Sequence, residues 1–300
     1  MTVISESVRA PAKVNLCLRI CGQRTDGYHL IHSVMAPISL YDELEIAVDD
    51  ACHTTARQPI SLRSDSNDIP SGPGNLAYRA AAAFMSAASR RILIDIHLRK
   101  RIPIGSGLGG GSSDAAAVLL ALNRVTGHLL QPNELADIGA EIGADVPFFI
   151  FGRPARVEGI GDQVTPTNLG PALNLVVCSD GHVLSTAAVY SRLREPTLSL
   201  TREPPVSNIT AFVEGRRPFT DLLVNDLEEA AALIHPEVLS VKARVMGEGA
   251  QAALMSGSGS AVFGVWADRQ GAVAAAMRLR EQGLWAEAVQ TLERSPAVES

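Results

Sequence analysis

The stretch Pro103-Ile104-Gly105-Ser106-Gly107-Leu108-Gly109-Gly110-Gly111-Ser112-Ser113 is the most informative part of this chain. It holds five glycines in seven residues, and the helix-forming run Ala115–Leu122 follows it after Asp114. Glycine lets the backbone curl and bring its N–H groups close to a ligand. A helix N-terminus adds unpaired N–H groups and partial positive charge. A flexible linker would not lead straight into a helix, so the stretch predicts a phosphate-binding loop.

Two common phosphate-binding motifs fit this loop poorly. The P-loop needs a Lys directly after its last Gly, and Ser112 stands there instead. The dinucleotide fingerprint can be placed on Gly105, Gly107 and Gly110, but no acidic residue follows about twenty residues on, after a second strand. Residues 123–134 predict a turn there, so the sequence excludes a P-loop and disfavours a Rossmann fold.

Composition narrows the class of protein. The 300 residues are 46% hydrophobic, enough for two domains, and the net charge is -6. No basic cluster exceeds residues 99–101, which argues against a nucleic-acid partner. The first residues are polar, and the apolar runs are too short to span a membrane. We therefore expect a cytoplasmic protein. Its four cysteines lack the spacing of a metal site and are expected to be reduced: Cys17, Cys21, Cys52 and Cys178. No pattern in the chain specifies an oligomeric state.

Hydrophobic periodicity predicts a mixed chain of the α+β class, with a boundary near residue 168 that gives domains 1–168 and 169–300. Asn75 and Asn133 are expected to cap the first and third helices of the first half. In that half we predict strands at 12–21, 43–48 and 91–98, helices at 75–89, 115–122 and 133–142, a buried run at 146–151 and a hairpin at 155–164. In the second half we predict strands at 172–178, 251–255 and 261–266, a loop at 202–205, and helices at 185–194, 209–214, 225–234, 236–246 and 269–282.

Lys13 is the first candidate for chemistry. Lys occurs at only three positions, 13, 100 and 242, although Arg is common. Lys presents a compact point charge that approaches an oxyanion end-on, which the broad guanidinium of Arg does not. Alternation places Lys13 and Asn15 on the same face of the first strand. A solvent-exposed strand face is the simpler alternative, and we attribute the other two lysines to chance.

Three further segments carry candidate site residues. Asp145, in Gly143–Pro147, precedes the apolar run 148–151, and a partly dehydrated carboxylate there suits a general base. Tyr28 and His29 offer a stacking face and hydrogen bonds to a flat ligand. Residues 256–260 form a second Gly/Ser loop, which could lend N–H groups to another anion. Taken singly, each has an ordinary explanation: a turn Asp, a surface loop and a bulged hairpin.

Taken in order, these segments resemble the motifs of the GHMP kinases. The three motifs correspond to residues 11–16, 103–113 and 256–264, and the resemblance covers most of the chain. Within the superfamily the chain is most similar to the branch that phosphorylates 4-diphosphocytidyl-2-C-methyl-D-erythritol (CDP-ME), as judged by the segments 13–16, 24–29, 143–147 and 225–228. The resemblance implies a ribosomal-S5-like N-terminal ATP domain, a ferredoxin-like C-terminal substrate domain, and an active site between them.

The resemblance also implies an activity and roles for residues. ATP would donate its γ-phosphoryl group to the 2-hydroxyl of CDP-ME in the non-mevalonate isoprenoid pathway, with Mg²⁺ bridging phosphate oxygens. Lys13 and Asp145 match the catalytic pair. Asn15, Tyr28, His29 and Tyr190 match substrate positions. The residues matched to ATP are Asn75, Pro103, Ile104, Gly105, Ser106, Gly107, Leu108, Gly109, Gly110, Gly111, Ser112 and Ser113, the last two also being candidates to help hold Mg²⁺; Ser106 stands where relatives often carry Gly.

Two other functions compete with this one. The first is another small-molecule kinase of the superfamily, acting on mevalonate, homoserine or a sugar, and the segments around Tyr28 and Asp145 argue against it. The second is a regulator that binds nucleotide without catalysis. Such a chain would be expected to lose Lys13 or Asp145, and both are present.

Overall fold

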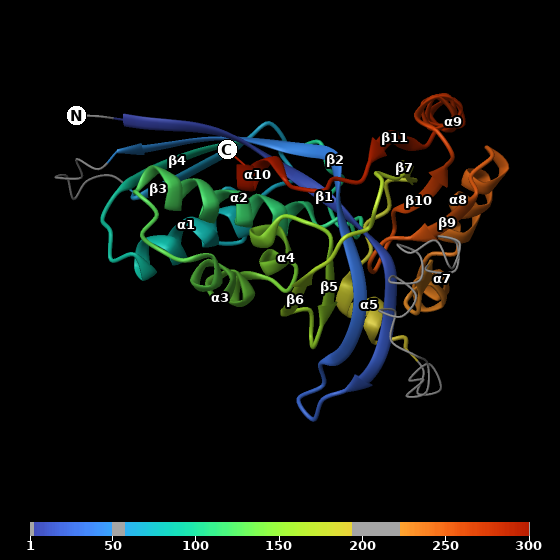
Figure 1. Cartoon of the computed structure of the whole chain (residues 1–300), viewed down its shortest axis with the longest axis horizontal. Coiled ribbons are helices and arrows are strands. Elements are labelled where there is room, and N and C mark those ends of the chain that lie inside the picture. The colour runs from blue at the N-terminus through green and yellow to red at the C-terminus, as the bar shows by residue number, and fades with distance from the viewer. Residues whose placement is uncertain (1–2, 50–57, 194–222, 300) are drawn as a thin grey trace.

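The structure is a computed structural model that describes residues 3–49, 58–193 and 223–299. It has two lobes, each built on a β-sheet, with the long β1–β2 hairpin extending past their junction (Figure 1). Cys52, the predicted loop 202–205 and the predicted helix 209–214 lie outside the described residues.

The first sheet is organised around two 21-residue strands, β1 (Val3–Gln23) and β2 (His29–Asp49), which pair antiparallel. Both are far longer than the sequence predicts. β-bulges between Pro11 and Ala12, Asn15 and Cys17, and Ile20 and Gly22 let strands of this length bend and twist. The strand order is β3-β4-β2-β1-β8, and β5 also pairs with β2 and with β6. The bounds of the shorter strands are β3 (Ile60–Ser64), β4 (Leu93–Arg99), β5 (Ala155–Glu158), β6 (Gln163–Pro166) and β8 (Val224–Asn225).

Four helices cover one face of this sheet (Figure 1): α1 (Leu76–Ala87), α2 (Gly110–Val125), α3 (Pro132–Ile142) and α4 (Val146–Phe151). Asn75 caps α1 as predicted, since its Oδ1 accepts a hydrogen bond from the N–H of Ala77 at 2.8 Å. The cap predicted at Asn133 is wrong: α3 begins at Pro132, and the Gln131 N–H donates to Glu134 Oε2. Proline is favoured in the first helical turn because its missing N–H has no intrahelical role there.

The second sheet is antiparallel, with the order β11-β7-β10-β9. Helices α8 and α9 pack on it, and this arrangement is ferredoxin-like. Asn225 lies in a strand that pairs with β1, so the helix predicted from residue 225 begins only at Glu228. The sequence did not predict β11. The bounds are β7 (Asn174–Ser179), β9 (Ala252–Met255), β10 (Val262–Trp266), β11 (Trp285–Gln290), α5 (Thr186–Tyr190), α7 (Glu228–Ile234), α8 (Glu237–Gly247), α9 (Arg269–Glu281) and α10 (Pro296–Glu299).

A shared core joins the two lobes. Apolar side chains of β1 and β2, such as Val14 and Ile38, pack in one cluster with Val177 of β7 and Phe263 of β10. β1 and β2 therefore have packing partners on both faces, one supplied by helices and the other by the second sheet. The boundary at residue 168 stays a prediction.

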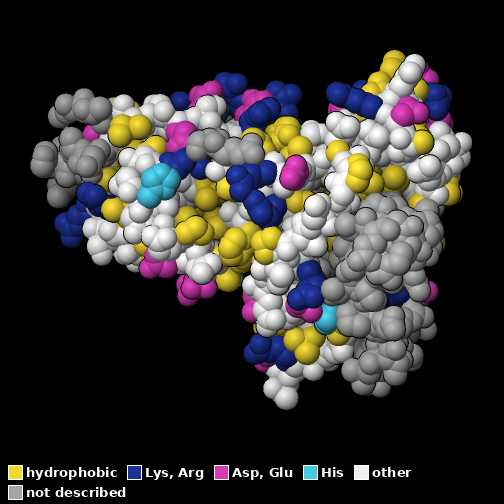
Figure 2. Space-filling model, viewed as in Figure 1, with side chains coloured by type: hydrophobic (Ala, Val, Ile, Leu, Met, Phe, Trp, Pro, Cys, Tyr) yellow, Lys and Arg dark blue, Asp and Glu magenta, His cyan; other side chains and the backbone are white. Residues whose placement is uncertain are grey.

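Two global features bear on partners. Among the described residues, no helix is long and apolar enough to cross a membrane. On the described part of the face in Figure 2, Lys and Arg side chains are interspersed with Asp, Glu and hydrophobic residues and form no continuous basic stripe. That distribution agrees with the net charge of -6.

Candidate active site

A cleft of about 950 Å³ lies between the two lobes and is lined by residues of both. It collects nearly every residue that the sequence singles out: Lys13, Asn15, Tyr28, His29, Asn75, Pro103, Ile104, Gly105, Ser106, Gly107, Gly109, Gly110, Gly111, Ser112, Asp145 and Tyr190. Leu108 and Ser113 are the exceptions, because both are buried and neither is among the lining residues.

The glycine loop connects β4 to α2 and presents the N-terminus of α2 to the cleft. Gly109 precedes the helix with a φ of 73°, a left-handed conformation that glycine adopts at little cost. The three carbonyl groups before it are already bonded: Ser106 O to the Ala261 N–H, Gly107 O to Ser256 Oγ, and Leu108 O to the Lys13 N–H. These bonds hold the loop in place, and the first N–H groups of α2, which have no partner within the helix, are left to bind an anion.

Lys13 and Asp145 meet at the end of this loop. Lys13 Nζ lies 3.4 Å from Asp145 Oδ2 and donates to Asn15 Oδ1 at 2.5 Å. Asn15 is held in turn by Ser33 Oγ, which accepts from its Nδ2 at 2.8 Å. The Lys13 side chain is 4% exposed and that of Asp145 28%, so the carboxylate alone reaches solvent appreciably. Asp145 is the N-cap residue of α4, but its side chain makes no capping hydrogen bond.

Lys100 is the functional candidate that the sequence analysis missed. Its Nζ bridges the buried carboxylates of Asp42 and Asp114 directly beneath the glycine loop, and Lys100 and Asp114 both line the cleft. Burial alone would lower the pKa of Lys100, but the two carboxylates outweigh it and raise that pKa. Burial raises the pKa of Asp114 against the attraction of Lys100. The rarity of Lys in this chain was a usable signal for Lys100 as well as for Lys13.

Aromatic side chains from both lobes also line the cleft. The rings of His29, at the start of β2, and Tyr190, at the end of α5, have centroids 5.2 Å apart. Burial lowers the pKa of His29, which favours the neutral imidazole. Burial, helped by the charge of Asp145, raises the pKa of Tyr190 to about 12, so its phenol stays protonated. Tyr28 is 62% exposed, which leaves its ring face available to a ligand.

The second Gly/Ser loop, residues 256–260, completes the wall of the cleft. Ser256 Oγ accepts from the Asn15 N–H at 3.4 Å and donates to Gly107 O at 3.2 Å, joining the first strand to the glycine loop. Gly257 and Ser258 line the cleft, and Ser258 Oγ is 2.8 Å from Thr186 Oγ1. The three sequence motifs therefore contact one another directly.

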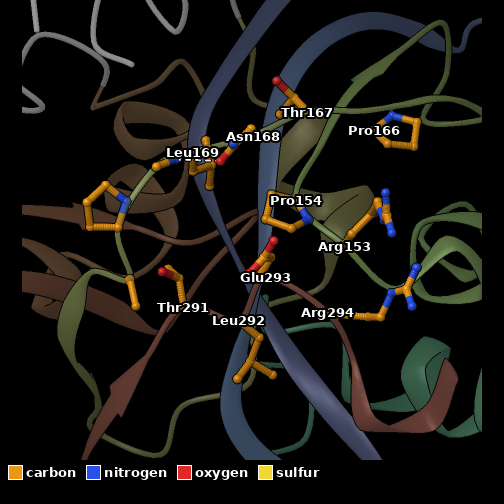
Figure 3. Close-up of a pocket in the computed structure, with 13 residues that line it drawn as sticks. Arg153, Pro154, Pro166, Thr167, Asn168, Leu169, Thr291, Leu292, Glu293 and Arg294 are labelled. Atoms are coloured by element: carbon orange, nitrogen blue, oxygen red, sulfur yellow. Dashed lines mark hydrogen bonds between the residues drawn. The ribbon is translucent and has the colours of Figure 1, made fainter. Parts of the chain in front are cut away.

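A second hollow, of about 940 Å³, lies elsewhere between the lobes (Figure 3). Arg153 and Arg294 both extend to the same side of it (Figure 3). Its lining includes none of the residues that the sequence singles out. The two hollows are nearly equal in volume, so it is the chemistry of the lining that identifies the first as the candidate active site.

Comparisons of the sequence with known proteins point to one family. The family described as GHMP kinases N terminal domain matches residues 75–153, and GHMP kinases C terminal matches residues 209–283. A 4-diphosphocytidyl-2-C-methyl-D-erythritol kinase from Geobacter sp. (strain M21) is 42% identical, over 94% of this chain and 98% of that protein. The protein of the same name from Geobacter sulfurreducens is 40% identical, over 95% of this chain and 99% of that protein.

Solved structures extend the comparison. A crystal structure of 4-(cytidine 5'-diphospho)-2C-methyl-D-erythritol kinase superposes with a TM-score of 0.78 at 38% identity, over 96% of this chain and all of that chain. Homoserine kinase from Cytophaga hutchinsonii gives a TM-score of 0.73 at 18% identity, over 98% of this chain and 96% of that chain. At that identity the second likeness supports the fold alone.

Proposed function

The chain belongs to the GHMP kinases, and because relatives about 40% identical over nearly its whole length are 4-diphosphocytidyl-2-C-methyl-D-erythritol kinases, we propose that it phosphorylates CDP-ME. It is an ATP-dependent small-molecule kinase that transfers the γ-phosphoryl group to the 2-hydroxyl of CDP-ME, a step of non-mevalonate isoprenoid synthesis. The single observation that carries this is one cleft lined both by the glycine loop, which suits a triphosphate, and by the ring pair of His29 and Tyr190, which suits a pyrimidine.

At the phosphate end, the N–H groups of the glycine loop and of the first turn of α2 hold the triphosphate, and Asn75 lies beside the nucleotide. At the other end, Tyr28, His29 and Tyr190 hold the cytosine, and Asn15 contacts the sugar alcohol. The two ligands then meet beside Lys13 and Asp145. Phosphoryl transfer depends mainly on positioning and charge neutralisation, which this arrangement supplies.

Asp145 is proposed to accept the proton of the 2-hydroxyl as the hydroxyl oxygen bonds to the γ-phosphorus. The bond from that phosphorus to the β–γ bridging oxygen breaks, and ADP leaves with the electron pair. Lys13, whose Nζ lies 3.4 Å from the carboxylate, offsets negative charge near the reacting oxygens. The side chain of Asp145 makes no capping hydrogen bond to α4, so none has to break when it takes this role.

The residues present also fit Mg²⁺. The described residues include no cluster of three or more His, Cys, Asp or Glu side chains that could hold a metal. Phosphate oxygens would therefore have to supply most of the ligands of the ion. Ser112 lines the cleft, and Ser113 Oγ is buried without a hydrogen-bond partner in the described part of the chain. We propose Ser112 as the protein oxygen at this site, with Ser113 behind it. When bound, the ion neutralises charge on the phosphate oxygens.

The test compares acceptors at equal concentration. The protein is incubated with ATP, Mg²⁺ and either CDP-ME, mevalonate, homoserine or galactose, and ADP is measured. ADP formation that depends on CDP-ME supports the proposal. ADP formation that depends on another acceptor instead, or no acceptor-dependent ADP formation, refutes it. A cytoplasmic location is proposed with it, supported by the free thiols of Cys17, Cys21 and Cys178 among the described residues.

A further inference from the structure

The segment Asn225-Asp226-Leu227-Glu228 has no part in the chemistry above, yet its three polar side chains all bind neighbouring elements. Asp226 accepts from Arg19 Nη1 at 2.9 Å and from the Ile20 N–H at 3.0 Å, which ties the segment to β1. Glu228 accepts from the Met255 N–H at 3.1 Å and pairs with Lys242. The segment therefore connects the first strand to the end of β9, where the second Gly/Ser loop begins.

Of the three polar side chains, that of Asn225 bonds a residue that lines the cleft, Gly257. Its Nδ2 donates to Met255 O at 2.9 Å and to Gly257 O at 2.8 Å, and its Oδ1 accepts from the Leu227 N–H at 2.9 Å. The side chain is thus bonded at both ends, and the residue is only 7% exposed. Its two donor bonds fix the backbone on either side of Ser256.

That backbone lies against the reacting groups. A Cβ added to Gly257 would stand 3.2 Å from Lys13 Nζ, 3.3 Å from Asn15 Oδ1 and 3.0 Å from Gly107 O. The φ of Gly257 is +56°, a left-handed conformation. Ser256 also bridges Asn15 and Gly107 through its hydroxyl group. A shift of this loop would be transmitted directly to Lys13, Asn15 and the glycine loop.

We infer that Asn225 is a positioning residue for phosphoryl transfer, which holds the Gly257 backbone where it packs against Lys13 and Asn15. The inference rests on the proposed function but concerns a residue that touches neither substrate. Because Asn225 acts, through Gly257, on Lys13 and Asn15, its loss should lower kcat more than it raises either KM. A misplacement of about 1 Å can cost about 10²-fold in rate.

The test is Asn225→Asp, which keeps the shape, removes both donors and places a carboxylate against two carbonyl oxygens. Asn123→Asp is the matched control. Asn123 is 5% exposed, its Nδ2 donates to Leu130 O at 2.9 Å and its Oδ1 accepts from the Leu130 N–H at 2.9 Å, but it does not line the cleft. Both variants should lose thermal stability. Only Asn225→Asp should lose kcat, by roughly 10–100-fold with each KM within about threefold of wild type.

Three outcomes are decisive. Equal kcat values in folded Asn225→Asp and Asn123→Asp would overturn the inference, as would a rise in KM at unchanged kcat. If Asn225→Asp does not fold, Asn225→Ala and Gly257→Ala disturb the same backbone without a buried charge, and wild-type kcat in both would also overturn it. The wild-type protein separates the two proposals: its failure to form ADP with CDP-ME refutes the proposed function, whereas normal wild-type turnover with equal kcat values in the two variants refutes the positioning role alone.

Discussion

Gly109→Ala tests whether the phosphate loop and the catalytic lysine form one unit. Gly109 has a φ of +73°, and an added Cβ would lie 3.0 Å from the Phe149 ring and 3.1 Å from Lys13 Cγ. The left-handed backbone costs a non-glycine residue about 1–2 kcal/mol. Phe149 and Lys13 are 2% and 3% exposed, so crowding them adds the usual overpacking cost of about 1–3 kcal/mol.

The expected total is roughly 2–5 kcal/mol, a fall in Tm of about 4–20 °C at about 2–4 °C per kcal/mol. Gly127→Ala is the matched control, because Gly127 also has a positive φ, +90°, but nothing lies within 4 Å of its added Cβ. This control should lose only the backbone term, about 2–8 °C, and keep wild-type kinetics.

Steady-state kinetics provide the decisive assay. Gly109→Ala should raise the KM for ATP at least about tenfold, because relief of the crowding and of the left-handed backbone displaces the anion-binding N–H groups that follow residue 109. It should also lower kcat about 10–100-fold as Lys13 moves. Wild-type values of both constants in a folded Gly109→Ala protein would refute the reasoning. So would an equal kinetic loss in Gly127→Ala.

Three further predictions concern other parts of the molecule. Tyr28→Ala should raise the KM for CDP-ME roughly 5–150-fold, which corresponds to about 1–3 kcal/mol of stacking, and should leave the KM for ATP unchanged. If only the KM for ATP changes in Tyr28→Ala and His29→Ala, the loop binds the nucleotide instead. Lys100→Met leaves two buried carboxylates unpaired and should cost about 3–5 kcal/mol, seen as a lower Tm at pH 7, and a wild-type Tm would contradict this ion pair. Burial opposes the ionisation of Asp180, but hydrogen bonds, including one from His235, outweigh it and lower the pKa of Asp180 below 3.8. Asp180→Asn should therefore melt below wild type at pH 6, with a difference in Tm that shrinks below pH 3.8 and vanishes as pH falls through the lowered folded-state pKa. A pH-independent difference would argue against this linkage.

The sequence predicted those parts of the site that depend on local chemistry. The glycine loop, the cap at Asn75 and the apolar wall behind Asp145 all follow from residues adjacent in the chain, and the structure has them. The sequence also placed Lys13 and Asn15 on one strand face, and their side chains are hydrogen-bonded. The roles assigned to these residues stay predictions.

The sequence could not predict features whose cause lies far along the chain. The first half of β2 has no clean two-residue alternation because Val34–Ile38 is buried on both faces, and only the second sheet explains that burial. Asn225 begins a strand only because β1 lies beside it. Lys100 stands between two arginines, as in an exposed basic run, and its burial depends on Asp42, 58 residues away.

The most direct test of the central claim is the turnover of Asp145→Asn with ATP, Mg²⁺ and CDP-ME, measured beside its affinity for ATP. Asn is nearly isosteric with Asp and cannot accept the hydroxyl proton, and the side chain makes no capping bond that the fold would lose. The account predicts a folded protein with wild-type ATP affinity and a kcat about 10²–10⁴-fold lower. A folded Asp145→Asn protein that turns over CDP-ME at the wild-type rate would contradict it.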